Sequence, residues 1–160
     1  MIVIGIDIGT TSVCGVAADP ETGKLLRSVT RANDSALQSE KPFERCQDPR
    51  RILQICTEIY RGFLQEFSNV RAVGFSGQMH GVLCLDGAGE PRRTACPMAS
   101  GYGFTTLFYN RLNGEMPAET AKVCTVHDYV AIRFCGLHEP VTHVSDAASF
   151  GLFDLEKLCF

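Results

Sequence analysis

The sequence predicts an α/β fold, a mixed sheet with flanking helices, on the strength of three patterns. An apolar, β-branched run at Ile2–Ile8 opens the chain as a buried central strand, and a hairpin pattern follows it. A long amphipathic helix pattern at 49–67 then leads into a further apolar run at 70–75. A hairpin joins antiparallel strands, whereas a helix that returns to the sheet implies a parallel pair. The expected sheet therefore contains both kinds of pairing.

The other segments of the first half are assigned from local signals. In chain order we expect strands at 13–18 and 25–31 around a turn at 19–23, a loop at 32–47, the helix, the strand at 70–75, a loop at 76–81 and a strand at 82–86. Asp48 fits the N-cap of the helix, and Pro49 fits its first position, where a missing N–H does no harm.

The second half reads mostly as helix and loop. We expect irregular chain at 91–101, helices at 102–112, 117–123 and 126–135, a loop at 138–142 and a hydroxyl-rich turn at 145–149. Thr125 and Asp128 have the spacing of a capping box, and Gly136 fits a C-terminal stop.

Composition indicates a soluble globular protein. The chain has 160 residues, 45% of them apolar and 21% charged, with a net charge of -3, which fits a single domain at 1–160. A mildly acidic chain lacks the basic face of most nucleic-acid-binding proteins, so we expect no nucleic-acid partner. No apolar window could span a bilayer and no signal peptide opens the chain, so we expect no membrane association and a cytoplasmic location.

The eight cysteines are widely spaced, and none forms a Cys-x-x-Cys pair, which disfavours common zinc and thioredoxin-type sites. Cys56, Cys84 and Cys135 lie within apolar patterns. We therefore expect small buried thiols in a reducing compartment rather than disulfides.

The end of the first strand is suited to a phosphate. Asp7 places a carboxylate inside the apolar run, where we expect it to be buried with a partner. The turn 9–12, Gly-Thr-Thr-Ser, follows at once, and its amides and hydroxyls can face phosphate oxygens. An ordinary turn with Asp7 on its rim is the alternative, and these residues alone leave both open. Because ligands of such sheets collect at the carboxyl ends of strands, the loops 7–12 and 76–80 are expected to line a site.

Four blocks resemble the N-terminal domain of FGGY carbohydrate kinases, in the same order and over nearly the whole chain. They are Ile-Gly-Ile-Asp-Ile-Gly-Thr-Thr-Ser at 4–12, Val-Gly-Phe-Ser-Gly-Gln-Met-His-Gly at 73–81, His-Asp-Tyr-Val-Ala-Ile-Arg-Phe-Cys-Gly at 127–136, and Ser-Asp-Ala-Ala-Ser at 145–149 with Leu-Phe-Asp at 152–154. The second block is similar to that of xylulokinase-like members, and the chain after Tyr102 to that of sedoheptulokinase-like members.

The resemblance implies a ribonuclease H-like fold of the actin/hexokinase-type ATPases. It also implies transfer of the γ-phosphoryl group of ATP, with Mg²⁺, to a sugar such as the ketoses sedoheptulose and xylulose. In that comparison Asp7 holds Mg²⁺ through water, Gly9, Thr10, Thr11 and Ser12 cradle phosphates, and Gln78, Met79 and His80 contact the sugar.

Several of these residues have structural alternatives. Gln78 and His80 could be solvated loop residues, and Met79 could pack in the core. Asp146 either approaches the active site or forms the turn around it. His127 and Asp128 are expected to be structural, because they open a helix.

The chain departs from the family in three places. Cys14 stands where relatives carry Lys or Arg, and no Trp is present, so the family's Trp-x-Asp-x-Arg motif is missing near 92–98. The family's catalytic Asp and its C-terminal nucleotide-binding lobe lie beyond Phe160. We therefore expect an incomplete N-terminal lobe, with no catalytic residue in this chain and no turnover by itself.

Two rival interpretations remain. One is a non-catalytic sugar- or phosphate-binding or interaction module derived from a sugar kinase, which Cys14 and the missing Trp motif favour. The other is a different actin-like ATPase, which the Gln-Met-His sequence at 78–80 disfavours. A single lobe would also expose apolar surface, so a homodimer is compatible with the sequence.

Overall fold

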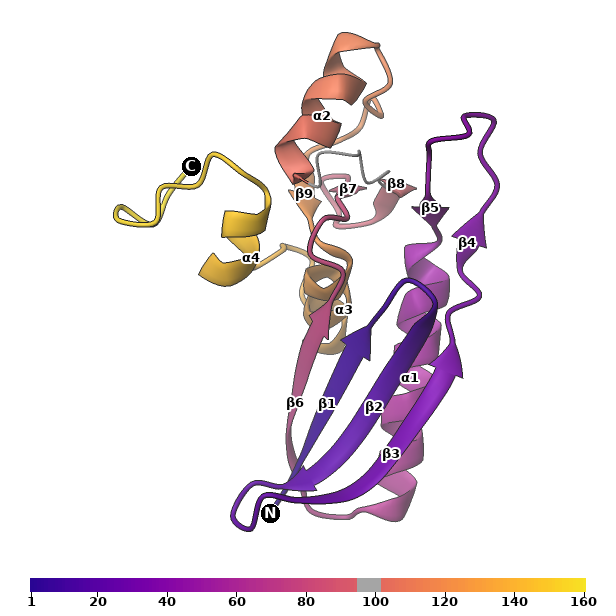
Figure 1. The fold of residues 1–160 in the computed structure, drawn as a ribbon, viewed down its shortest axis with the longest axis vertical. Coiled ribbons are helices and arrows are strands. Elements are labelled where there is room, and N and C mark those ends of the chain that lie inside the picture. Colours follow the sequence, from indigo (N-terminus) through magenta and orange to yellow (C-terminus); the bar gives the residue numbers. More distant parts are fainter. Residues whose placement is uncertain (95–101) are drawn as a thin grey trace.

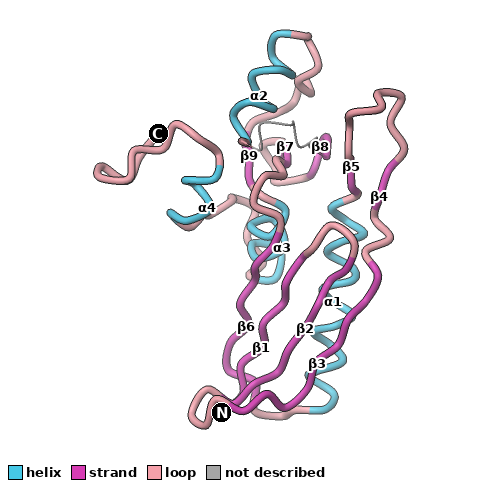
Figure 2. Tube along the Cα trace, viewed as in Figure 1, coloured by secondary structure: helices cyan, strands magenta, loops and turns pink. Residues whose placement is uncertain are grey.

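The computed structural model describes residues 1–94 and 102–160 (Figures 1 and 2). In chain order its elements are β1 (Ile2–Ile8), β2 (Ser12–Asp19), β3 (Lys24–Ala32), β4 (Ala36–Leu37), β5 (Cys46–Gln47), α1 (Pro49–Glu66), β6 (Val70–Gly77), β7 (Leu83–Leu85), β8 (Pro91–Thr94), α2 (Gly103–Leu112), β9 (Lys122–Cys124), α3 (Val126–Phe134) and α4 (Val144–Ser149).

The main sheet has four strands in the order β3-β2-β1-β6. β1 pairs antiparallel with β2 and parallel with β6, and β2 pairs antiparallel with β3. The mixed sheet, its hairpin and its parallel strand are therefore confirmed. β3 and β6 are the two edges of this sheet.

Helices α1 and α3 cover one face of the main sheet. Figure 1 shows α1 running along it, and the buried core joins residues of the sheet to residues of both helices: Ile4, Ile6, Ile8, Val13, Ala17, Ile52, Ile55, Cys56, Ile59, Phe63, Tyr129, Val130 and Ile132. We call the opposite side of the sheet the open face; its residues include Gly5, Asp7, Cys14, Val16, Gly74 and Ser76. Strand residues alternate between the two faces, so β1 is buried on one face only. The expectation that Asp7 is buried is wrong for this reason: it lies on the open face and is exposed.

The start of α1 is as predicted. The Asp48 side chain accepts a hydrogen bond from the Arg50 N–H at 2.9 Å, and Pro49 occupies the first turn. Gly15 of β2 lets the helix approach closely, because a Cβ at this position would lie 2.4 Å from Ile59 Cγ2. The helix is thus held against the strand that follows the 9–12 turn.

A second sheet, of order β8-β7-β9, lies beyond the main one, next to α2 (Figure 1). Two expectations fail here. The segment 91–94 is strand β8 rather than irregular chain, and 117–123 is a turn leading into β9 rather than a helix, because both strands pair with the buried strand β7. The rest of the predicted irregular segment, 95–101, lies outside the described residues.

Three further local expectations can be compared with the structure. The segment 32–47 was expected to be a loop but contains the paired strands β4 and β5. The capping box of α3 is confirmed in both directions, and Gly136 follows the helix with a φ of 68°. The segment 145–149 belongs to helix α4 rather than to a turn, because the His143 side chain caps it by accepting from the Ser145 N–H.

All seven described cysteines are free thiols. Cys56, Cys84 and Cys124 are buried as expected, and burial raises the pKa of Cys56 to about 12. Cys135 is exposed, contrary to expectation, because it is the C-cap of α3 rather than part of its packed face. Within residues 1–94 and 102–160, the helices are too short or too polar to cross a membrane.

Candidate functional site

The carboxyl ends of β1 and β6 lie side by side at one end of the main sheet. Asp7 is the register partner of Ser76, and Ile8 is the partner of Gly77. The chains that leave these two strands line one pocket of about 410 Å³, formed by residues 7–10 on one wall and 77–81 on the other. We call it the end pocket. It brings together the two loops that the sequence selected.

Asp7 has polar neighbours on both adjacent strands. The Ser76 hydroxyl of β6 donates to Asp7 Oδ1 at 2.6 Å. On the other side its register partner is Cys14 of β2, whose thiol lies 3.4 Å from the Thr30 hydroxyl oxygen. Cys14, the position where the family resemblance implies a basic residue, is therefore directly beside Asp7.

Three carbonyl oxygens of the 9–12 turn, those of residues 9, 10 and 11, bond to the segment 33–47. The Gly9 carbonyl accepts from Asn33 Nδ2 at 2.7 Å, and the Thr11 carbonyl accepts from the Asn33 N–H at 2.9 Å. The Thr10 carbonyl between them accepts from Gln47 Nε2 at 3.0 Å.

This carbonyl arrangement exposes amides on the other side of the turn. In a planar trans peptide the C=O of one residue and the N–H of the next point in opposite directions. The Thr10 and Thr11 N–H groups therefore point away from the 33–47 segment, and within the described residues they donate to no other group. Such a pair of adjacent free amides suits an anion. Gly9 is required at the start of the turn, because a Cβ there would lie 2.8 Å from the Ser12 carbonyl oxygen.

The opposite wall presents Gln78, Met79 and His80. Gln78 is half-buried, and its Nε2 donates to Gln47 Oε1 at 2.7 Å. Met79 is 58% exposed, so the alternative that it packs in the core is wrong. His80 is exposed, with its ring edge-on to Tyr102 at a centroid distance of 6.5 Å. These side chains offer hydrogen-bonding groups and an apolar surface, the two features that a sugar requires.

Helix α4 supports this wall from behind. The Ser149 hydroxyl lies 2.7 Å from the Met79 carbonyl oxygen and equally close to that of Asp146, and can donate to either. The Asp146 carboxylate lies 3.3 Å from Nε2 of the buried His127, whose ring is packed under Gly77. Asp146 is not among the residues that line the end pocket; His127 and Ser149 lie between it and the pocket residues Gly77 and Met79.

His127, Asp128 and Asp146 bring possible metal-ligand atoms within 4.8 Å of one another. Asp128 is already engaged, because one of its oxygens accepts from Thr142 and from the Thr125 N–H of the capping box. These bonds agree with the structural role expected for Asp128.

Sequence reasoning placed Ser76 in a loop expected to line the site and Ser149 in a family block, but it missed the contacts of both, as well as those of Asn33 and Gln47. Asn33 had a local signal, since its side chain forms a turn with Ser35 two residues later. Gln47, Ser76 and Ser149 had none, because each acts on a chain segment more than 30 residues away.

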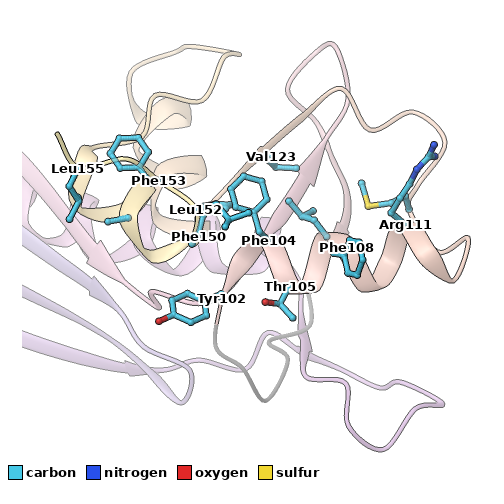
Figure 3. Close-up of a pocket in the computed structure, with 14 residues that line it drawn as sticks. Tyr102, Phe104, Thr105, Phe108, Arg111, Val123, Phe150, Leu152, Phe153 and Leu155 are labelled. Atoms are coloured by element: carbon cyan, nitrogen blue, oxygen red, sulfur yellow. The ribbon is translucent and has the colours of Figure 1, made fainter. Parts of the chain in front are cut away.

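A larger cavity than the end pocket lies elsewhere. An apolar groove of about 920 Å³ lies between α2 and the chain that follows α4. Figure 3 shows Phe104, Phe150 and Leu152 among its lining side chains. The apolar side of α2 faces this groove and leaves Phe108 64% exposed. Few polar groups line the groove, so it does not suit a phosphate or a sugar.

The comparison with protein families identifies the family of this chain. Residues 2–101 match the model for the N-terminal domain of the FGGY family of carbohydrate kinases. This chain belongs to that family. Human sedoheptulokinase is 30% identical over 204 aligned positions, which cover 98% of this chain and 43% of the relative. Xylulose kinase from Staphylococcus epidermidis strain RP62A is 34% identical over 98 positions, covering 59% of this chain and 19% of the relative.

A solved structure of an FGGY-type enzyme supports the fold. Ligand-bound xylulose kinase from Lactobacillus acidophilus superposes with a TM-score of 0.86 at 22% identity, over 99% of this chain and 38% of that one. The ribonuclease H-like α/β fold is thereby confirmed. The FGGY chain described here spans less than half the length of the sedoheptulokinase that it matches. The aligned positions also outnumber its 160 residues, so that relative carries insertions which this chain lacks.

Proposed function

We propose that this chain supplies the sugar- and phosphate-binding half of an ATP-dependent sugar kinase site, with a ketose of the sedoheptulose or xylulose type as acceptor. The end pocket is the single observation that carries the proposal. One of its walls offers Thr10, with its free amide, beside the Asp7 carboxylate, and the other offers a glutamine, a methionine and a histidine. Phosphoryl transfer requires a phosphate chain and a sugar hydroxyl to meet in this way.

Each wall has a distinct task in the proposed site. The Thr10 and Thr11 amides and hydroxyls, with Gly9 and Ser12, hold phosphate oxygens. Asp7, oriented by Ser76, orders the water shell of Mg²⁺. Mg²⁺, when bound, neutralises charge on the phosphates. The residues present fit this ion, because a carboxylate beside a hydroxyl is an all-oxygen donor set.

The sugar wall binds and orients the acceptor. Gln78 accepts a hydroxyl proton in a hydrogen bond, His80 bonds a second hydroxyl, and Met79 packs on the apolar face of the sugar. The proton of the reacting hydroxyl would be removed by the family's catalytic Asp, which the resemblance places after the part of the sequence that corresponds to this chain. We therefore propose that the isolated chain, a cytoplasmic single lobe, binds ligands without turning over.

Calorimetric titration tests the proposal. We expect D-xylulose or sedoheptulose to bind the wild-type chain, and Gln78→Ala and His80→Ala to weaken that binding about tenfold, as expected when a hydrogen-bonding partner of the ligand is removed. Gln54→Ala is the matched control, because Gln54 is an exposed glutamine of α1 bonded to Glu58. Absence of sugar binding, or equal loss in the control, would contradict the proposal.

Cys14 favours a second candidate, a non-catalytic sugar- or phosphate-binding module. Without a cation beside Asp7, phosphate charge is less well compensated, which suits binding without transfer. Fusing the chain to the C-terminal lobe of human sedoheptulokinase discriminates between the two. Sugar phosphorylation by a folded fusion supports the kinase half-site, whereas sugar binding by the fusion without phosphorylation supports the module.

A further inference from the structure

The Gln47 side chain connects the two walls of the end pocket. Its Nε2 donates to the Thr10 carbonyl oxygen at 3.0 Å, on the phosphate side. Its Oε1 accepts from Gln78 Nε2 at 2.7 Å, on the sugar side. Both ends of one amide are therefore engaged, each with a different wall.

The backbone of Gln47 is anchored, which gives this bridge a fixed origin. Gln47 pairs with Ala36 in the β4–β5 ladder. The next residue, Asp48, caps α1, and its N–H donates to the Ser35 carbonyl at 2.8 Å. The Gln47 side chain is half-buried and its backbone is held in place, so it has few alternative positions. A shift of the Thr10 peptide should therefore also shift the Gln78 amide.

The bridge also determines which end of Gln78 is free. Gln78 uses its amide nitrogen to bond Gln47, and its Oε1 is turned towards Gly81, 3.9 Å from where a Cβ on that glycine would lie. Gln78 therefore presents an acceptor to the pocket. A sugar hydroxyl placed there would donate its proton to Gln78.

We propose that Gln47 is a positioning residue that couples the phosphate wall to the sugar wall, so that occupancy of one favours binding at the other. This inference rests on the proposed function. A phosphate bound at the 9–12 turn fixes the Thr10 peptide, and the Thr10 carbonyl then fixes the Gln47 side chain. Gln47 in turn holds the Gln78 amide in its sugar-binding orientation. Because coupling between two sites is reciprocal, the sugar must favour the phosphate ligand by the same factor.

The test measures the dissociation constant of D-xylulose by calorimetry, with and without saturating Mg-ATP. In the wild-type chain we expect Mg-ATP to tighten sugar binding about fivefold or more, the lower end of typical coupling. In Gln47→Ala the factor falls to about one, while Mg-ATP alone binds within about threefold of wild type, since Gln47 itself touches neither ligand. Gln47→Glu keeps the acceptor for Gln78 and removes the donor to Thr10, so it also loses the coupling. Gln54→Ala, the matched control on α1, retains it.

A ligand-free measurement separates this inference from the proposed function. The side-chain amide protons of Gln78 are expected to exchange slowly with solvent in the wild type and fast in Gln47→Ala, as followed by NMR. Coupling that survives in Gln47→Ala, or binding of both ligands without coupling in the wild type, overturns the inference and leaves the proposed function intact. Failure of the wild type to bind either ligand, with the Gln78 amide protected, overturns the proposed function instead.

Discussion

Ser76 donates its hydroxyl proton to the Asp7 carboxylate at 2.6 Å, from the facing position of the neighbouring parallel strand. The bond engages one carboxylate oxygen, and the other has no hydrogen-bond partner among residues 1–94 and 102–160. Because β1 and β6 are hydrogen-bonded along their length, the distance between the two residues is set by the sheet. The carboxylate is thus oriented before any ligand arrives.

Asp7→Asn tests the charge of that carboxylate while retaining its shape. We expect Mg-ATP affinity to fall about tenfold or more, the scale seen when the shell around a metal is altered, with sugar affinity nearly unchanged. Calorimetry with each ligand measures both. Asp19→Asn, at the far end of β2, is the control. An equal loss of sugar and Mg-ATP affinity in Asp7→Asn would argue for a general structural effect.

Cys14→Lys restores a basic residue beside Asp7. An exposed ion pair contributes at most about 1 kcal/mol, so we expect a gain in ATP affinity of up to about fivefold. Cys14→Met, similar in length but uncharged, should give no gain. The comparison is made by titration at low and high salt, because screening should abolish the effect of the lysine. A gain that persists at high salt would point to packing instead of charge.

Gly15→Ala should destabilise the fold, because its Cβ would lie 2.4 Å from Ile59 and 2.8 Å from Phe63. We expect the free energy of unfolding to fall by about 1–3 kcal/mol, as for other overpacked cores. Gly74→Ala is the matched change on the open face, where a Cβ meets nothing within 4 Å. It should be neutral or stabilise by up to about 1 kcal/mol. Urea unfolding measures both, and equal effects would refute the close approach of α1.

Asp86→Asn should make the stability of the fold less dependent on acid pH. Backbone hydrogen bonds from Glu90, together with Arg92 and the Ala88 N–H, lower the pKa of Asp86 below its usual value. A lowered folded-state pKa stabilises the fold above the unfolded-state pKa, about 4, and this contribution is lost as the pH falls through the folded-state value.

The difference in unfolding free energy between wild type and Asp86→Asn should therefore be largest near pH 7 and shrink below about pH 4. Urea titrations across that range measure it. Glu119→Gln, which removes an exposed acid, should leave the pH dependence as in the wild type. A difference that stays constant with pH would mean that Asp86 acts through packing alone.

The first half of the fold could be predicted because its signals are local. Asp48 and Pro49 mark the start of α1, and the alternation of apolar residues marks the strands of the main sheet. The strands β8 and β9 could not be predicted in the same way. Each is only three or four residues long, and each pairs with β7 to form a strand. Pairing of this kind is determined by tertiary contact.

In the candidate site, too, the residues with local signals could be predicted and those that act through distant contacts could not. Asp7, the 9–12 turn and the 78–80 sequence were selected from motifs and the topology rule for strand ends, and they line one pocket. The exposure of Asp7 agrees with the alternative that placed it on the rim of the turn, and the expectation of burial failed because helices cover only one face of β1. Gln47 was assigned to a featureless loop, since nothing in its neighbourhood indicates which distant carbonyl it will reach.

The two edge strands of the main sheet, β3 and β6, carry basic side chains. β3 carries the basic residues Lys24, Arg27 and Arg31, and Arg71 is the second residue of β6. Like charges brought together by edge-to-edge pairing of two molecules would repel each other. High salt should weaken that repulsion, so purification and storage of this protein at low ionic strength should best protect it from aggregation.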